Sequence, residues 1–282
     1  MTTTEALLRG GLERRGDDLW LTLDPTFQGL PDTAHGGSVL AVFHLLAGAG
    51  LPAAVRGRYR RRVPLGVPLT VRVEPGEDRL ACRVEDGAAA VLAEGEVGSA
   101  GDGVAAGDPV PPLDAARAHP LPVAAACLAC GTRNALGLQA RLAFDDEVVA
   151  GTWQPRPPLV AADGSLAPLA LTTLLDEAAY WLGVLASGES GLTTELAVTL
   201  AEPVPFGTPV TVHGRRAAVR ARAEDPRYWD TVVEARTPGD RRVAWGRITF
   251  VAVRGAARRL AQAMLALNPP EVVRRAFPAY VR

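Results

Sequence analysis

The chain has 282 residues, 48% of them hydrophobic and 22% charged, with a formal net charge of −1. These values are ordinary for one large or two small globular domains, and the near-neutral charge excludes a bulk electrostatic attraction to nucleic acid or membrane surfaces. All 30 basic residues are arginine, which excludes lysine chemistry such as Schiff bases. We see no apolar run near the roughly 20 residues of a membrane span and no secretory leader, so we expect a cytoplasmic protein.

Short strand-like segments bounded by Gly, Pro or Asp dominate the first half of the chain. Residues 1–18 are a polar segment, and a short strand is expected at 19–23. An apolar helix opens at His35 and runs to about Ala47. Four further strands are then predicted, at 56–63, 69–73, 79–84 and 88–97. We expect the first domain to span residues 1–100.

Residues 101–122 are rich in Gly, Pro and Ala and predict a linker. The second domain is expected at 123–255, with a helix at 168–185. Its predicted strands lie at 139–144, 148–154, 194–200, 210–215, 220–223, 231–235 and 243–253. Residues 256–282 form a tail, with a surface helix at about 256–267.

One nine-residue pattern occurs twice. The pattern V-P-x-G-x-P-x-T-V begins at Val63 and again at Val204, with its prolines and glycine at identical spacing. An internal period should be settled before the fold is assigned, and two copies of this length indicate a duplicated domain. Each copy contains strand, helix and then several antiparallel strands, which predicts an α+β architecture.

The two predicted helices differ in their polar positions. The second helix has one apolar stripe, formed by Leu171, Leu174, Leu175, Ala178 and Leu182. Two adjacent carboxylates, Asp176 and Glu177, lie on its other side, and a solvated helix face is the plainer interpretation of such a pair. At the position matching Asp176 the first helix has His44, which we interpret as a hydrogen-bonded core histidine.

The starts of the two helices also differ. His35-Gly36-Gly37 opens the first helix, where glycine leaves the backbone N–H groups approachable by a carbonyl oxygen that gains negative charge. The second helix has Pro168 there, which carries no N–H. One copy therefore keeps the donors and the other keeps the acid.

Cys127 and Cys130 have the spacing of a redox pair or a zinc knuckle. A structural zinc site needs about four ligands, and His119 is the only imidazole close to the pair in the sequence. We therefore expect a structural turn and no metal site, with metal binding as the lesser alternative. Three cysteines do not form a disulfide framework.

In these motifs the chain resembles the hotdog-fold acyl-CoA thioesterases, in particular the group whose central helix begins with His-Gly-Gly. The first copy matches that group at 35–37 and 63–66, and the second at 174–178 and 204–207. A segment seen in some members matches Cys127, Cys130, Gly131, Asn134, Gly137 and Leu138. The resemblance implies two tandem hotdog domains, each a curved antiparallel sheet wrapped on a central helix, paired side by side as an intramolecular pseudo-dimer.

The resemblance also implies an active site between the two helices. Gly36 or Gly37 would hold the thioester oxygen, and Asp176 would act as nucleophile or general base. His35 would shape the turn or contact the substrate. Glu177, Thr173, Tyr180 and Gln28 are the candidate supporting residues. The opposite site, with His44 and residues 167–169, should be inactive.

Arginines alternate along the strand predicted at 56–63. Arg56, Arg58, Arg60 and Arg62 would share one face, and Arg58 and Arg60 are our candidates for binding CoA phosphates. The alternative is a charged edge that prevents aggregation. The expected partner is an acyl-CoA or acyl-carrier-protein thioester with no cofactor, no nucleic acid and no membrane, and pairing into a homodimer is left open.

Three other functions remain as alternatives. The protein could be a non-catalytic acyl-CoA-binding or scaffold protein, since divergence of both half-sites also results from decay. A double-hotdog hydratase or dehydratase usually carries an Asp-x-Asn-x-x-His motif, which this chain lacks. An acyl-CoA thioesterase II arrangement, with Asp, Gln and Thr as its triad, would keep the reaction but move the site.

Overall fold

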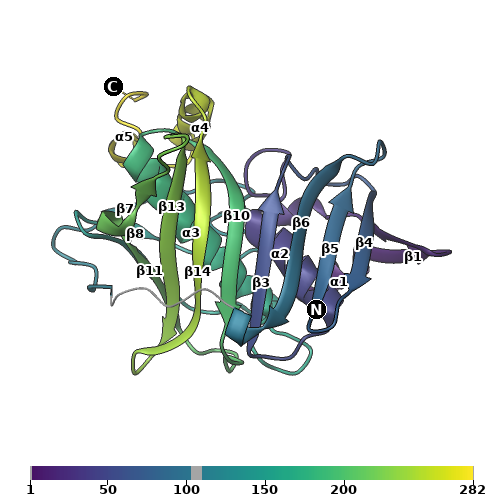
Figure 1. The fold of residues 1–282 in the computed structure, drawn as a ribbon. Coiled ribbons are helices and arrows are strands. Elements are labelled where there is room, and N and C mark those ends of the chain that lie inside the picture. The colour runs from purple at the N-terminus through teal and green to yellow at the C-terminus, as the bar shows by residue number, and fades with distance from the viewer. Residues whose placement is uncertain (1, 103–109, 282) are drawn as a thin grey trace.

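The fold is a single curved antiparallel sheet with two long helices on one side (Figure 1). The structure is a computed structural model that describes residues 2–102 and 110–281. Within these residues the sheet has fourteen strands, in the order β1-β2-β4-β5-β6-β3-β10-β14-β13-β11-β9-β8-β7, with β12 beside β13. This is an α+β architecture, as the sequence predicts.

The first half of the chain supplies one half of the sheet. Its elements are α1 (Thr4–Gly10), β1 (Leu12–Arg15), β2 (Asp18–Leu21), α2 (Gly36–Ala47), β3 (Ala53–Tyr59), β4 (Leu69–Pro75), β5 (Arg79–Glu85) and β6 (Val91–Ser99), with short 3-10 turns at Pro25–Phe27 and Ala100–Asp102. Residues 103–109 of the predicted linker lie outside the described residues.

The second half supplies the rest of the sheet. Its strands are β7 (His119–Pro120), β8 (Ala143–Phe144), β9 (Val148–Trp153), β10 (Gly191–Leu200), β11 (Val210–Arg215), β12 (Arg220–Ala221), β13 (Tyr228–Thr237) and β14 (Arg241–Ala252). Its helices are α3 (Pro168–Ser187), α4 (Ala256–Leu265) and α5 (Pro270–Ala276), with 3-10 turns at Pro157–Leu159 and Arg216–Ala218.

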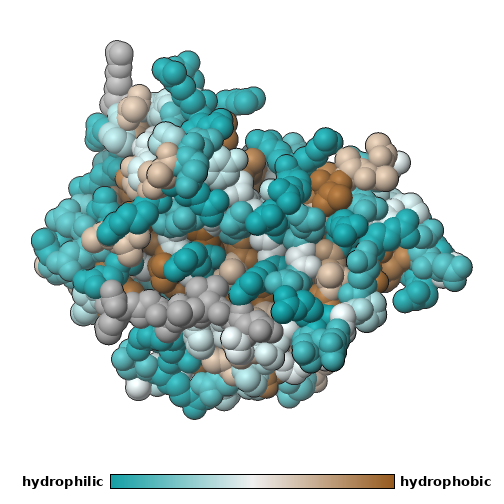
Figure 2. Space-filling view, viewed as in Figure 1, coloured by the Kyte–Doolittle hydropathy of each residue, from teal (hydrophilic) through white to brown (hydrophobic). Residues whose placement is uncertain are grey.

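The two halves meet where β3 pairs with β10. This antiparallel pairing sets Val55 opposite Val198 and Arg58 opposite Glu195. The valines are buried, whereas the charged pair is exposed or half-exposed, because successive side chains of a strand point to opposite faces. Charged side chains make much of the face away from the helices hydrophilic (Figure 2).

The helices α2 and α3 lie against each other and against the inner face of the sheet (Figure 1). By length and composition α3 could cross a membrane, but 83% of its most apolar window is buried inside the protein. It also carries Asp176 and Glu177 at its middle. The prediction that no segment is long and apolar enough was therefore wrong for α3, because a fully enclosed core helix has the same composition as a membrane span.

Two regions differ from the predicted elements. The segment predicted to be polar contains α1 and, from Leu12 onward, most of the β1-β2 hairpin. Leu8 of α1 is buried, and Gly16 in the hairpin turn adopts a positive φ of 61°. A seven-residue helix is too short to show a periodic signal. The strand predicted at 139–144 shrinks to β8, because Leu138 and Ala140 donate their N–H groups to residues 128 and 129 instead.

Candidate active site

The start of α2 contacts the middle of α3. The N–H of Gly37 donates a hydrogen bond of 3.0 Å to Oδ2 of Asp176, and Nδ1 of His35, the N-cap residue, lies 3.1 Å from the same oxygen. Gly37 N–H also lies 3.2 Å from His35 Nδ1. Beside a carboxylate we place the proton on Nδ1, so Asp176 accepts from both groups. The N-terminus of α2 and Asp176 of α3 are therefore as close as the comparison of the two helix sequences predicts.

Glycine at position 37 is what allows the helices to approach. A Cβ there would lie 2.6 Å from the carbonyl oxygen of Thr172 and 2.7 Å from Cα of Thr173. The Thr172 hydroxyl donates a hydrogen bond of 2.8 Å to the Gly37 carbonyl oxygen. Because Gly36 and Gly37 have no side chain, the α3 backbone can approach the N-terminus of α2.

Asp176 is 4% exposed and has three donors. Besides Gly37 and His35, the Thr193 hydroxyl donates a hydrogen bond of 2.6 Å to Oδ1. Burial by itself would raise the pKa of Asp176, but the charge and hydrogen bond of His35, the Thr193 hydroxyl and the Gly37 N–H together hold that pKa below its usual value. The carboxylate is therefore ionised at neutral pH.

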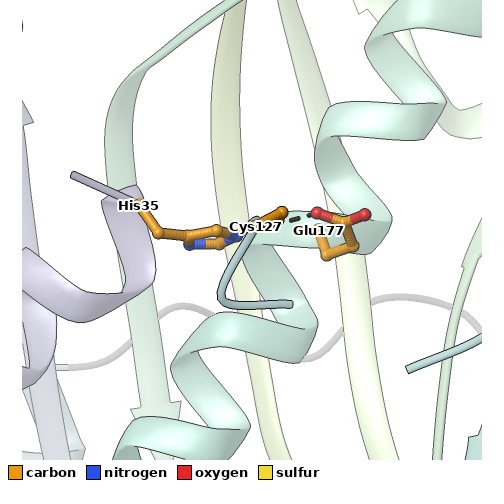
Figure 3. A group of neighbouring side chains, drawn as sticks. All are labelled: His35, Cys127 and Glu177. Atoms are coloured by element: carbon orange, nitrogen blue, oxygen red, sulfur yellow. Dashed lines mark ion pairs between the residues drawn. The ribbon is translucent and has the colours of Figure 1, made fainter. Parts of the chain in front are cut away.

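His35 lies between two carboxylates. Its Nε2 is 3.7 Å from Oε2 of Glu177, whose other oxygen accepts a hydrogen bond of 3.0 Å from Trp181 Nε1. Burial by itself would lower the pKa of His35, but the contacts with Asp176 and Glu177 raise that pKa well above its ordinary value. Cys127 lies at the same imidazole (Figure 3).

Gly36 has a different environment from Gly37. Its carbonyl oxygen accepts a hydrogen bond of 2.7 Å from the Tyr59 hydroxyl. Its N–H makes no hydrogen bond to any described residue, as expected for the first N–H of a helix. A Cβ at Gly36 would lie 2.7 Å from Oδ2 of Asp176. The site therefore places an unused backbone donor beside an ionised carboxylate.

These groups line a cavity of about 310 Å³. Six of the predicted site residues line it, namely His35, Gly36, Arg60, Asp176, Glu177 and Tyr180. Part of the wall is apolar, formed by Leu30, Val63, Trp181, Leu192, Val251, Leu260 and Met264. The last two belong to α4, so the predicted surface helix of the tail also covers the site.

Four predicted residues do not line the cavity, namely Gln28, Thr173, Gly37 and Arg58. Gln28 accepts the Asp32 N–H through its side chain at 3.4 Å and the Leu128 N–H through its carbonyl at 2.6 Å, so it closes a turn. Thr173 is fully buried, with its hydroxyl unpaired in the described part of the chain. Gly37 sits behind Gly36, with its N–H already bound to Asp176.

The arginines separate into two groups, which corrects the prediction of four guanidinium groups on one face. Arg56 and Arg58 lie on the outer face, where Arg58 Nε is 3.4 Å from a Glu195 carboxylate oxygen. The strand ends at Tyr59 because the N–H groups of both Arg60 and Arg61 turn to the Leu92 carbonyl, which breaks the alternation. Arg60, Arg61 and Arg62 line the cavity instead.

Sequence reasoning missed Thr193, Tyr59 and Arg61. Thr193 lies at a shift in register between β10 and β14, and irregular pairing of this kind often re-aims side chains near functional sites. Nothing in the sequence pattern distinguishes it from Thr194. Tyr59 follows the alternation of β3, since Val55 and Gly57 also face inward.

No protein-family model matches the chain, and no curated protein does. Solved structures match over most of its length. A candidate thioesterase II from Thermobifida fusca has a TM-score of 0.61 at 16% identity, over 90% of this chain and 100% of its own. A protein of unknown function with a hot dog fold from Alicyclobacillus acidocaldarius has a TM-score of 0.56 at 12% identity, over 86% and 95%. This chain has the hotdog fold.

Another solved structure that is similar to this chain is a dehydratase domain. The domain of PpsC from Mycobacterium tuberculosis, in complex with C12:1-CoA, has a TM-score of 0.53 at 13% identity, over 86% of this chain and 96% of its own. Because one fold supports different reactions, the activity of this hotdog protein has to be argued from its site.

A second, smaller cavity of about 190 Å³ lies at the other end of the helix pair in this hotdog fold. It is lined by His44, Ala167, Pro168 and Leu169, the residues predicted to form an inactive site, and by α1. His44 is not the hydrogen-bonded core histidine we expected, because its buried Nε2 has no partner among the described residues. Burial, the largest influence, lowers its pKa.

Proposed function

We propose that the protein hydrolyses an acyl thioester of CoA or of an acyl-carrier protein in the cavity at Asp176. The observation that carries this is the pairing of an ionised, buried carboxylate with the unused N–H of Gly36, both at the wall of one cavity. A thioester carbonyl needs a donor for the oxygen that gains charge and a base or nucleophile on the other side. This site supplies both.

We infer that Asp176 activates water rather than attacking the carbonyl itself. Both of its oxygens accept hydrogen bonds, Oδ1 from Thr193 and Oδ2 from Gly37, which hold the carboxylate in place, and a remaining lone pair can still take a proton from water. Water attacks the carbonyl carbon and gives a proton to Asp176, while the oxygen binds the Gly36 N–H. The carbon–sulfur bond then breaks, and the proton passes to the leaving thiolate.

The cavity also favours a substrate with a small or medium acyl group. Its volume of about 310 Å³ lies at the low end of ligand pockets, which run from about 300 to 1,000 Å³. The acyl chain fits the apolar wall that includes Leu192 and Met264. The nucleotide must then lie outside, where Arg61 and Arg62 form no ion pair with any described residue and are exposed.

We further infer that residues 1–100 and 123–255 are two hotdog units that arose by duplication. Each unit carries one long helix against its half of the sheet, and the β3–β10 pairing joins the halves edge to edge. In this arrangement the donor of one unit and the acid of the other form a single composite site. An Asp-Gln-Thr arrangement shares Asp176 and Thr193, but no glutamine lines the cavity among the described residues.

The test is thiol release from a panel of aliphatic and aromatic acyl-CoA thioesters by wild type and Asp176→Asn. We expect the variant to lose on the order of 10²–10⁴-fold in kcat, as for removal of a general base. The enoyl-CoA hydration assay, run beside it, should show no reaction. Binding of CoA esters without thiol release would instead establish the non-catalytic alternative.

A further inference from the structure

Three buried side chains from three separate segments converge beside Asp176 (Figure 3). His35 comes from the start of α2, Cys127 from the loop before β8 and Glu177 from the middle of α3. Their potential ligand atoms, Nε2 or Nδ1, Sγ and a carboxylate oxygen, all lie within 4.8 Å of one another. Each residue is at most 6% exposed. The proposed hydrolysis assigns no chemistry to Cys127 or Glu177.

The spacing of these atoms fits a tetrahedral metal ion. Zinc bonds to nitrogen, oxygen and sulfur of about 2.0–2.3 Å place the ligand atoms of a tetrahedron about 3.3–3.8 Å apart. For a nitrogen–oxygen pair the expected separation is about 3.3–3.5 Å, so the 3.7 Å between His35 Nε2 and Glu177 Oε2 is slightly longer than a bound ion would set. The Cys127 sulfur lies within 4.8 Å of both of these ligand atoms.

A candidate fourth ligand lies in the same loop. Cys130 follows Cys127 by three positions. Cys130 is 7% exposed and lines the same cavity. Two cysteines separated by two residues are a common half of a structural zinc site. His119 does not take part, because its ring packs on Phe144 at 5.6 Å.

The loop is held against the 3-10 turn at Pro25–Phe27 by other contacts. Leu128 N–H donates to the Gln28 carbonyl at 2.6 Å, and the Asn134 side chain donates to the Thr26 carbonyl at 2.8 Å. A Cβ at Gly131 would lie 2.2 Å from the Cys127 carbonyl oxygen, so the tight turn after the cysteines requires glycine. The cysteines are therefore presented to His35 by a built loop.

The surroundings also orient the ligands as in a metal site. Nδ1 of His35 faces the Asp176 carboxylate at 3.1 Å, which leaves Nε2 for a metal. Trp181 Nε1 holds one oxygen of Glu177 at 3.0 Å, which leaves Oε2. Metal-binding histidines almost always donate their other N–H to a carboxylate or carbonyl, and ligating carboxylates are themselves hydrogen-bonded.

We propose that the protein binds a zinc ion through His35 Nε2, Glu177 Oε2, Cys127 Sγ and Cys130 Sγ. All four positions are filled by protein, so the ion is structural. The two thiols bind as thiolates and His35 binds through a neutral imidazole, so both thiol protons and the proton on Nε2 pass to solvent. The ion fixes the His35 ring, and through it the Asp176 carboxylate, and it joins the two helices to the cysteine loop.

The test is elemental analysis of tag-free protein that has been purified from zinc-supplemented medium without chelator. We expect one zinc ion per chain, and less than about a tenth of that in Cys127→Ser and Cys130→Ser, because each loses a thiolate ligand. Cys82→Ala, which removes the third cysteine of the chain, should keep full zinc. Cobalt-substituted wild type should show thiolate-to-cobalt charge transfer and the strong visible bands of a tetrahedral site.

Absence of zinc from wild type, or full zinc in both cysteine variants, would overturn the proposal. If the variants fail to fold, a mercurial titration of wild type decides the matter, because blocking the two thiols should release the ion in step with the titration. Thr193→Val, which leaves all four ligands intact, should retain zinc whether or not it hydrolyses thioesters. Zinc binding and hydrolysis can therefore fail independently.

Discussion

The carboxylate of Asp176 accepts a 3.0 Å hydrogen bond from the N–H of Gly37, a residue 139 positions earlier in the chain. That bond ties the middle of α3 to the first turn of α2. It also leaves the neighbouring Gly36 N–H unused at the cavity wall. Two adjacent glycines thus have different tasks, since one holds the acid and the other is open to a substrate oxygen.

Thr193→Val should lower kcat by about 10- to 100-fold. The change removes a 2.6 Å hydrogen bond to an ionised carboxylate, and bonds to charged groups contribute about 1.5–3 kcal/mol. Thr193→Ser should restore most of the rate. Thr194→Val is the matched control, because its hydroxyl donates to the Thr249 carbonyl and not to Asp176. Equal losses in both valine variants would contradict a specific role for Thr193.

The attacking group can be identified by one turnover in ¹⁸O-labelled water with enzyme in excess. If Asp176 activates water, the labelled oxygen should appear in the released acid, and the Asp176 peptide should keep its mass. If Asp176 attacks the carbonyl, an acyl-aspartyl anhydride forms as the thiolate leaves, and water that attacks its aspartyl carbonyl puts the label in Asp176 and leaves the released acid unlabelled. Label in the Asp176 peptide, measured by mass spectrometry, would therefore overturn the water-activation mechanism.

Gly37→Ala should destabilise the protein by about 1–3 kcal/mol, the usual cost of overpacking, and abolish most hydrolysis. Its Cβ would meet the α3 backbone at 2.6–2.7 Å, so α2 must move away from Asp176. Gly50→Ala is the control, since nothing lies within 4 Å of a Cβ there. The free energy of unfolding, measured by urea denaturation, should be unchanged in the control and reduced in Gly37→Ala.

Reversing the charge of Arg61 and Arg62 together should raise KM for acyl-CoA about 10-fold, which corresponds to roughly 1.4 kcal/mol of lost binding. Thioesters of N-acetylcysteamine, which lack the nucleotide, should keep their KM. Arg58→Glu should leave the KM of both substrates unchanged, because Arg58 lies on the outer face beside Glu195. If Arg58→Glu raised KM and the Arg61 and Arg62 variant did not, the CoA phosphates would bind on the outer face of the sheet, which would contradict the proposed role of Arg61 and Arg62.

His44→Leu should leave hydrolysis intact and stabilise the protein by about 1 kcal/mol, because it removes a buried, unpaired nitrogen. Burial lowers the pKa of His44 in the folded state. The unfolded chain then binds more protons just below its own pKa of about 6.5, so wild-type stability falls as pH drops through that value. The advantage of the variant should therefore grow from pH 7 to pH 5. Loss of hydrolysis in His44→Leu would show that the second cavity is active.

The local patterns of the sequence were sufficient for both long helices and for most strands. Hydrophobic periodicity and the glycines after His35 predict α2 to within one residue of where it begins. The complementary losses in the two helices predict that Asp176 and the start of α2 share a site. These features depend on residues close together in the sequence, or on a repeated pattern, so they can be predicted without knowing how the helices and strands pack together.

Contacts between distant segments decided the rest. The register shift at β10 aims Thr193 at Asp176, and the end of β3 at Tyr59 turns Arg61 and Arg62 toward the cavity while Arg58 stays outside. The imidazole beside Cys127 is that of His35 from the start of α2, and not that of His119, which is nearer in the sequence.

The sequence by itself determined the class of fold, both long helices and most strands, and it predicted Asp176 as the acid of a shared site. Only the tertiary structure decided which side chains surround that acid, because burial and hydrogen bonding at Asp176 depend on α2, β10 and the cysteine loop meeting at one point. Side-chain type and spacing fix what each segment can offer, and the packing of the segments fixes what each side chain touches.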